Sequence, residues 1–219
     1  MNLSLKNKIL VPVLALIVLG MGISTAVSYF QSKKTVETQL NSELVRITDS
    51  SVQSLSSFVD DRKLDIGSWS SEALYEKAMT QGLMGKAARK SASKRMAHLK
   101  GAYDYYANIF LADENGDLIA ASAEDAVGSI NVADRAYFKK SMQGETALSE
   151  VIKSRATGLP TFVVSAPVHV SDRVKGVLLA TVKVEAFSSR FIDTIEVGEK
   201  GYAYIYDADG TVLAHPDKS

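Results

Sequence analysis

The strongest pattern along the chain is an uncharged apolar segment near its start. Residues 9–30 carry no charged side chain, and at about 1.5 Å of rise per residue roughly 20 helical residues cross a hydrocarbon core of ~30 Å. Lys6 and Lys8 precede the segment, and Tyr29 and Phe30 lie where interfacial aromatic side chains are expected. A cleaved leader would have a shorter apolar core and a small-residue cleavage site. We therefore expect an uncleaved signal anchor, although both interpretations send the following residues across the membrane.

The next apolar positions follow an imperfect heptad. Val45, Val52, Val59 and Ile66 recur at seven-residue intervals, which predicts an amphipathic helix that continues to at least about Leu74. In one interpretation its apolar face packs on its own domain. In the other, part of this face also pairs with a second copy and gives a homodimer through the long helix. The two interpretations are compatible with each other.

Past residue 85 the pattern changes between helical and strand periods. The predicted elements are a basic helix over 86–100, a hairpin of 105–113 and 117–122, a helix over 135–142, a hairpin of 161–170 and 174–184, and a helix over 185–195. Asp134 is the expected N-cap of the short helix and Gly144 its stop. This order predicts an α+β domain whose antiparallel sheet has helices on one side.

One hairpin segment is repeated later in the chain. The offset is 202 − 106 = 96 at five identical positions, namely Tyr106, Ala107, Ile109, Ala112 and Asp113 against Tyr202, Ala203, Ile205, Ala208 and Asp209. We expect a second lobe with the same first strand to begin at Gly201, and chance agreement of two hairpins is the alternative. A second lobe starting there would lack most of its sheet, so the chain is expected to be a fragment of a longer protein.

Composition and motifs narrow the function classes. Lys plus Arg and Asp plus Glu are both 25, and this neutral balance argues against a general nucleic-acid binder. The absence of cysteine excludes thiolate metal sites, thiol catalysis and disulfides. His98, His169 and His215 lack metal-ligand spacing, and the acidic turns at Asp113 and Asp207 lack the glutamate of a calcium loop. We therefore expect no enzyme, no metal and no cofactor.

Four stretches carry a resemblance to a known family. They are "DRAYF" (134–138), "SRATGLPTFVVSAPV" (154–168), "GVLLATV" (176–182) and "GYAYIYDADGTVLAHPD" (201–217). Together with the apolar anchor and the long helix, they resemble the double Cache (dCache) sensor domains of bacterial transmembrane receptors, above all methyl-accepting chemotaxis proteins. The resemblance implies two PAS-like lobes on one long helix outside the cytoplasmic membrane.

The resemblance gives an expected domain organisation for an inner-membrane protein with a periplasmic or extracellular sensor. Its parts are a cytoplasmic N-terminus at 1–8, a transmembrane helix at 9–30, a stalk helix and helical connection at 31–100, a membrane-distal Cache lobe at 101–197, and the start of a truncated membrane-proximal lobe at 198–219. The expected function is ligand sensing by a chemoreceptor. The alternatives are the sensor of a histidine kinase or a diguanylate cyclase, a membrane-anchored hydrolase, and a structural anchor without a ligand.

The family also implies a ligand site in the distal lobe. In members that bind amino acids, an arginine and two nearby aromatic residues contact the ligand carboxylate, and these map onto Arg135, Tyr137 and Phe138. The acidic residues that hold the ammonium group are replaced by Ser154 and Thr181. An ammonium group without an acid would be desolvated at a cost. We therefore expect a small carboxylate or a neutral molecule rather than a zwitterionic amino acid.

Other features of this segment leave alternatives open. Ile130 stands where the amino-acid pattern has a tyrosine. Glu150 could supply a negative group if the alignment is shifted. In the structural alternative, Arg135 pairs with a local acid, Asp134 or Glu150, and the two aromatic side chains fill the core.

Overall fold

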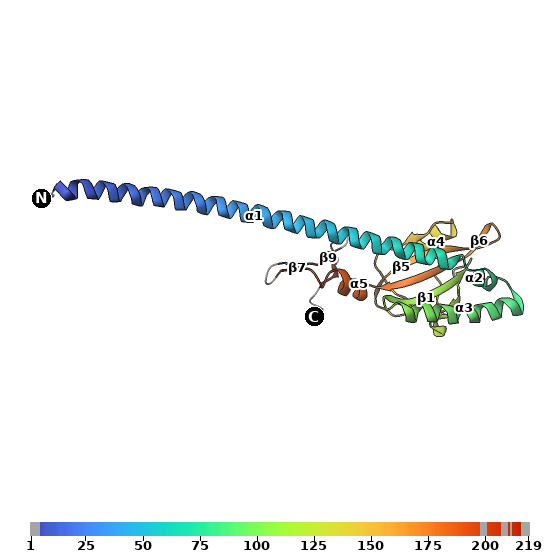
Figure 1. The fold of residues 1–219 in the computed structure, drawn as a ribbon. Helices are drawn as coiled ribbons and strands as arrows, with labels where there is room; N and C mark the ends of the chain where they lie inside the picture. The colour runs from blue at the N-terminus through green and yellow to red at the C-terminus, as the bar shows by residue number, and fades with distance from the viewer. Residues whose placement is uncertain (1–4, 198–200, 207–209, 211, 216–219) are drawn as a thin grey trace. The chain divides into compact units, whose positions relative to one another are not determined.

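The structure is a computed structural model that describes residues 5–197, 201–206, 210 and 212–215 (Figure 1). It divides into two compact units, Met1–Val52 and Gln53–Ser219. The α+β fold class expected from the sequence is confirmed, with helices packed on an antiparallel sheet in the second unit.

A single helix, α1 (Leu5–Ser70), contains the predicted apolar segment and the first part of the stalk helix and helical connection predicted at 31–100. Within the first unit the apolar side chains from Ile9 to Phe30 are exposed to the surroundings. Among the described residues, α1 is the one helix long and apolar enough to cross a membrane. Its length and composition therefore fit the predicted transmembrane segment.

The prediction that this helix continues to about Leu74 is wrong, because α1 ends at Ser70. The amides of Ser71 and Glu72 donate to the carbonyls of Ser68 and Trp69, which tightens the last turn. The Ser70 and Ser71 hydroxyls both donate to the carbonyl of Gly67. Serine side chains that bond the backbone in this way compete with helix continuation. Two further helices follow, α2 (Ala73–Ala78) and α3 (Gly82–Ala102).

The sheet of the second unit has the strand order β2-β1-β6-β5-β3, and β4 also pairs with β5. The strands are β1 (Tyr106–Asp113), β2 (Leu118–Ala121), β3 (Ala147–Leu148), β4 (Ile152–Lys153), β5 (Pro160–Val170) and β6 (Arg173–Lys183). All of these pairs are antiparallel. Both predicted hairpins are present, and the long-range pair of β1 with β6 joins them into one sheet.

The two faces of this sheet carry separate apolar clusters. One cluster packs side chains of α1, α2 and α3, including Ile66, Trp69 and Met96, against the sheet. The other packs α4 (Ala136–Met142) and the segment before it against the opposite face. Helices therefore cover both faces, whereas the sequence pattern had suggested one. In Figure 1, α3 and the last turns of α1 flank β1 and β5.

The remaining elements are η1 (Glu124–Ala126), α5 (Val184–Phe191), and the short strands β7 (Glu196–Val197), β8 (Gly201–Tyr202), β9 (Ile205–Tyr206) and β10 (Val212–Ala214). Strands β9 and β10 form an antiparallel pair with Tyr206 opposite Val212. This pair lies in the repeated segment, but Ala208 and Asp209 of the repeat lie outside the described residues. The predicted second lobe and the predicted domain boundaries therefore stay predictions.

Candidate ligand-binding site

A pocket opens on the sheet face that α4 covers. It contains about 360 Å³ of space free of protein atoms, mouth included. Its lining consists of the apolar side chains of Phe110, Leu118, Ile130, Val132, Tyr137, Ile152, Ala156, Val163 and Leu179 and the polar side chains of Arg135, Ser154, Arg155, Thr161 and Thr181. Four of the five predicted site residues therefore meet here, although the first and the last of them, Arg135 and Thr181, lie 46 positions apart in the sequence.

Arg135 stands at the N-terminus of α4, where its extended backbone makes it the N-cap. Its Nε atom is buried and has no hydrogen-bond partner among the described residues. Neither Asp134 nor Glu150 forms an ion pair with it, so the structural alternative of a local acid is not realised. A buried, unpaired guanidinium nitrogen costs free energy that an incoming acceptor oxygen would recover.

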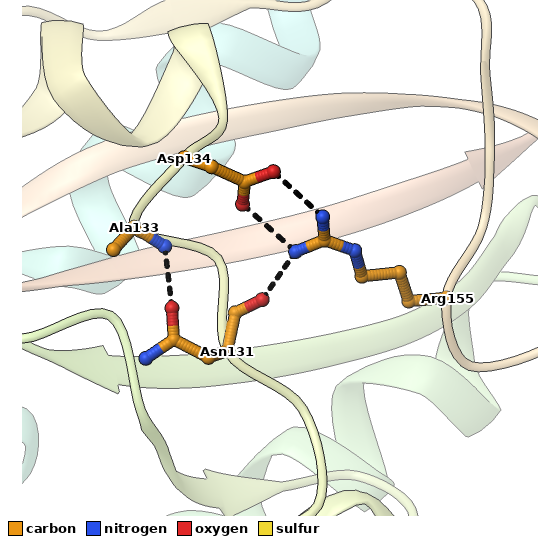
Figure 2. Close-up of polar contacts among 4 residues, drawn as sticks. All are labelled: Asn131, Ala133, Asp134 and Arg155. Atoms are coloured by element: carbon orange, nitrogen blue, oxygen red, sulfur yellow. Dashed lines mark hydrogen bonds and ion pairs between the residues drawn. The ribbon is translucent and has the colours of Figure 1, made fainter.

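Asp134 forms an ion pair with a different arginine, Arg155. Its two carboxylate oxygens accept from Nη1 and Nη2 of Arg155 at 2.8 and 2.7 Å, and Nη1 also donates to the carbonyl of Asn131 (Figure 2). The hydrogen bonds from Arg155 lower the pKa of the Asp134 carboxyl, and the carboxylate in turn raises the pKa of Arg155. The prediction that Asp134 caps α4 is wrong, because both of its oxygens are used in this ion pair and α4 has no side-chain cap.

Tyr137 and Phe138 are both buried in the apolar cluster beneath α4, but only one of them also lines the pocket. Tyr137 lines the pocket, and burial raises the pKa of its hydroxyl to about 12, so it is a protonated donor near neutral pH. Phe138 is not among the residues that line the pocket. Successive side chains on a helix point about 100° apart, so both cannot face the pocket in the same way. The structure thus does not bring Phe138 to the predicted site.

Ser154 and Thr181 differ in how their hydroxyls are used. The Ser154 oxygen accepts from the amides of Ala156 and Thr157 at 3.2 Å, which leaves its own proton available to a ligand. The Thr181 hydroxyl accepts from the Asn108 amide at 2.9 Å and donates to the Asn108 carbonyl at 3.0 Å. Thr181 therefore lines the pocket while its hydroxyl completes the β1–β6 pairing at a register shift.

The pocket offers mainly hydrogen-bond donors. Two guanidinium groups, the Tyr137 hydroxyl and the Ser154 hydroxyl line it, and no Asp or Glu is among the described lining residues. Carboxylate oxygens match such a set, because each accepts hydrogen bonds and the charge balances a guanidinium. Arg155 was missed by sequence reasoning. Its only signal was a position next to Ser154 in the matched stretch.

Other sites are weaker candidates. A wider hollow of about 1110 Å³ by the same measure is lined partly by Lys100 and Lys183. Their ammonium groups already donate to Asn108 Oδ1 and the Asp104 carbonyl. Within the described part of the chain, no group of three His, Cys, Asp or Glu side chains could hold a metal.

Comparison with known proteins agrees with the fold. A family model described as a Cache domain matches residues 26–219. The methyl-accepting chemotaxis protein PscA of Pseudomonas syringae pv. tomato is 19% identical over 217 residues, which cover 99% of this chain and 33% of PscA. The chain thus spans about a third of the length of this curated relative.

Two solved structures share the architecture. The sensor domain of the Vibrio cholerae histidine kinase DctB has a TM-score of 0.62 at 18% identity, covering 71% of this chain and 60% of that chain. The ligand-binding domain of the Pseudomonas fluorescens chemoreceptor CtaA, in complex with L-isoleucine, has a TM-score of 0.61 at 18% identity, covering 86% of this chain and 74% of that chain. At this identity the likeness establishes the fold.

Proposed function

Since the chain belongs to the Cache domain family, we propose that it is the ligand-sensing part of a bacterial transmembrane chemoreceptor and that its pocket binds a small carboxylate. The observation that carries the proposal is the buried, unpaired Nε of Arg135 in a pocket lined by donors. A carboxylate can accept two parallel hydrogen bonds from one guanidinium. The Tyr137 and Ser154 hydroxyls would donate to the same ligand, and the methyl group of Thr181 would close the apolar wall.

The position of the pocket suggests how binding becomes a signal. Tyr137 of α4 and residues of the 152–156 segment line it together with the sheet residues Phe110, Val163 and Leu179. A bound carboxylate would contact both layers and would shift the α4 segment and the 152–156 segment slightly relative to the sheet. A ligand shifts a conformational equilibrium by its difference in affinity for the two states. The last turns of α1 pack on the other face of the same sheet, so a shift in the sheet would displace them and would be passed on through α1 (Leu5–Ser70).

The proposal includes the wider organisation of the protein. Residues 1–8 would be cytoplasmic and 9–30 would span the inner membrane. The sensor would lie outside the cytoplasm, with the stalk at 31–100, the distal lobe at 101–197 and the second lobe beginning at 198. It would act as a homodimer and not as an enzyme. The same fold in the DctB sensor domain keeps a histidine kinase sensor as the second candidate, which the sequence of the output module would decide.

Arg135→Lys tests the proposed site. Lysine keeps the charge but cannot make a bidentate contact with a carboxylate, so we expect affinity for L-lactate to fall about 10-fold or more. Binding would be measured by titration calorimetry on the 219-residue chain in detergent micelles, and thermal unfolding would be followed by the fluorescence of Trp69.

The matched control is Arg173→Lys, at an exposed position where β6 begins. It should bind lactate as the unchanged chain does. Equal lactate affinity in the Arg135→Lys and Arg173→Lys variants would contradict the proposed site.

A further inference from the structure

We infer that the ion pair of Asp134 and Arg155 sets the charge of the ligand, and that the pocket selects a small monocarboxylate without a charged amine. The inference rests on the proposed function, because it concerns the ligand class of the same pocket. It adds two residues that sequence reasoning did not place in the site and gives each a role in selectivity.

The first step is the charge balance around the pocket. Arg135 and Arg155 contribute +1 each and line it, while Asp134 contributes −1 through its contact with Arg155. The net charge of these three groups is +1. A monoanion brings this local charge to zero, a dianion leaves −1, and a zwitterion leaves +1. An uncompensated charge in a partly desolvated site lowers affinity.

The second step concerns an ammonium group, which needs acceptors. The Ser154 oxygen already accepts two amide hydrogens, and the Thr181 hydroxyl is bonded to both backbone groups of Asn108. The Thr161 hydroxyl donates to the Val182 carbonyl, so its oxygen offers the ammonium group a neutral acceptor but no counter-charge. The Asp134 carboxylate has both oxygens on Arg155, as Figure 2 shows. The charge of this carboxylate is therefore already balanced, and the ammonium group of an amino acid would have to compete with Arg155 for it.

The third step concerns a second carboxylate. Arg155 uses Nη1 and Nη2 on Asp134 and shares Nη1 with the Asn131 carbonyl. A dicarboxylate would therefore compete with Asp134 for a guanidinium that is already neutralised. Asp134→Asn keeps the shape of the side chain and removes its charge, which leaves Arg155 available. Arg155→Gln does the opposite, because it leaves the Asp134 carboxylate available to an ammonium group.

Three probes separate these cases. L-Alanine replaces the hydroxyl of L-lactate with an ammonium group, and L-malate adds a second carboxylate to the lactate skeleton. Titration calorimetry on the full 219-residue chain in detergent micelles would give an affinity for each. We expect the unchanged chain to bind lactate at least about 10-fold more tightly than alanine or malate, a difference of ~1.4 kcal/mol.

The Asp134→Asn and Arg155→Gln variants should change the order of affinity for the three probes. In Asp134→Asn the local sum becomes +2, and malate should gain at least about 10-fold relative to lactate. In Arg155→Gln the sum becomes 0, and alanine should gain by a similar factor. Asp172→Asn, an exposed change in the turn between β5 and β6, is the matched control and should keep the original order. The Asp134–Arg155 pair is largely exposed, so both variants should fold, which Trp69 fluorescence would verify.

Two results would contradict the inference about ligand charge but would leave the proposed sensing function standing. One is an unchanged chain that binds alanine or malate as tightly as lactate. The other is a folded Asp134→Asn or Arg155→Gln variant that keeps the original order of affinities. In both cases the pocket still binds a solute, so the proposed sensing function survives. If none of the three probes binds the unchanged chain or either variant, the proposed carboxylate site and this inference both fail.

Discussion

Arg135 and Arg155 lie in one pocket, yet their guanidinium groups have opposite surroundings. Arg155 is exposed at the mouth and fully engaged with Asp134 and Asn131. Arg135 is half-buried, and the part of the chain that the structure describes offers its Nε no acceptor. Only Arg135 therefore has an unsatisfied buried donor whose desolvation cost a ligand oxygen can offset. This difference makes Arg135 the proposed anchor and Arg155 the proposed selectivity residue.

Thr181 shows how a pocket residue can have a structural role. Thr181→Val keeps the shape of the side chain but leaves the amide and carbonyl of the buried Asn108 without the hydroxyl partner. We expect the free energy of unfolding to fall by about 1–3 kcal/mol, measured by urea unfolding with Trp69 fluorescence. Lactate affinity at full folding should change little, because the methyl groups at the pocket wall remain.

The control at this position is Thr181→Ser, which keeps the hydroxyl and its two bonds to Asn108. Its stability should lie closer to that of the unchanged chain. A Thr181→Val variant of undiminished stability that no longer binds lactate would contradict this view and would point to direct ligand contact by the hydroxyl.

At the level of single residues, the sequence predicted which side chains meet in the pocket better than it predicted the charge pairing there. Arg135, Tyr137, Ser154 and Thr181 were selected from short matched stretches, and all four line the same pocket. The pairing of Asp134 with Arg155 was not predictable, since it depends on how two loops meet across 21 residues. The family resemblance maps Phe138 onto the site together with Tyr137, and it does not tell which of two adjacent helical side chains faces a cavity.

The elements of the fold depend on a few close backbone contacts. In α3, a Cβ added to Gly85 would lie 1.8 Å from the Thr80 carbonyl oxygen, whereas one added to Gly101 would meet nothing within 4 Å. Gly85 is buried and Gly101 is exposed, but both belong to the same helix. The α2–α3 connection therefore requires a glycine at one of these positions only.

This contrast gives a matched pair of substitutions. Gly85→Ala should lower the free energy of unfolding by about 1–3 kcal/mol, because backbone and not a flexible side chain must move. Gly101→Ala should raise it by up to about 1 kcal/mol, since alanine is the better helix former. Thermal unfolding followed by Trp69 fluorescence would compare them. Similar effects of the two substitutions would contradict the close packing of Gly85 on Thr80.

Elements whose signals are local were predicted well from the sequence. Both long hairpins and the short helix α4 follow from period, turn residues and a glycine stop within about ten residues. The break of α1 at Ser70 and the two-residue strands β3 and β4 were missed. The break depends on serine hydroxyls that compete with the backbone amides for the Gly67 carbonyl. The short strands β3 and β4 depend on pairing with β5 rather than on a pattern of their own.

At the scale of the whole molecule, the heptad residues of α1 are buried at one end of the series and exposed at the other. Ile66 is fully buried in the second unit, while Val45 and Val52 are 60% and 57% exposed. The C-terminal part of the heptad thus packs on its own lobe, as one interpretation expected. The exposed part favours pairing with a second copy, which remains a proposal, and exposed apolar side chains at heptad spacing are typical of such a seam.

Cysteine cross-linking tests this pairing without interference, because the sequence has no cysteine. Val52→Cys lies on the exposed apolar face, and Ser54→Cys lies about 200° further around the helix. In membranes under mild oxidation we expect a disulfide-linked dimer for Val52→Cys and much less for Ser54→Cys. Equal yields from the two variants, or a monomer in both, would contradict a homodimer through this face.

We propose that a solute carboxylate binds Arg135, and the Nε–H group of this residue reports such binding directly. In a ¹H–¹⁵N spectrum of the labelled 219-residue chain in detergent micelles, the Arg135 Nε resonance is assigned by its loss in Arg135→Lys. Titration with L-lactate should shift this resonance saturably, while the Arg173 Nε resonance stays in place. An Arg135 resonance that remains unmoved up to saturating lactate, alanine and malate would contradict the account.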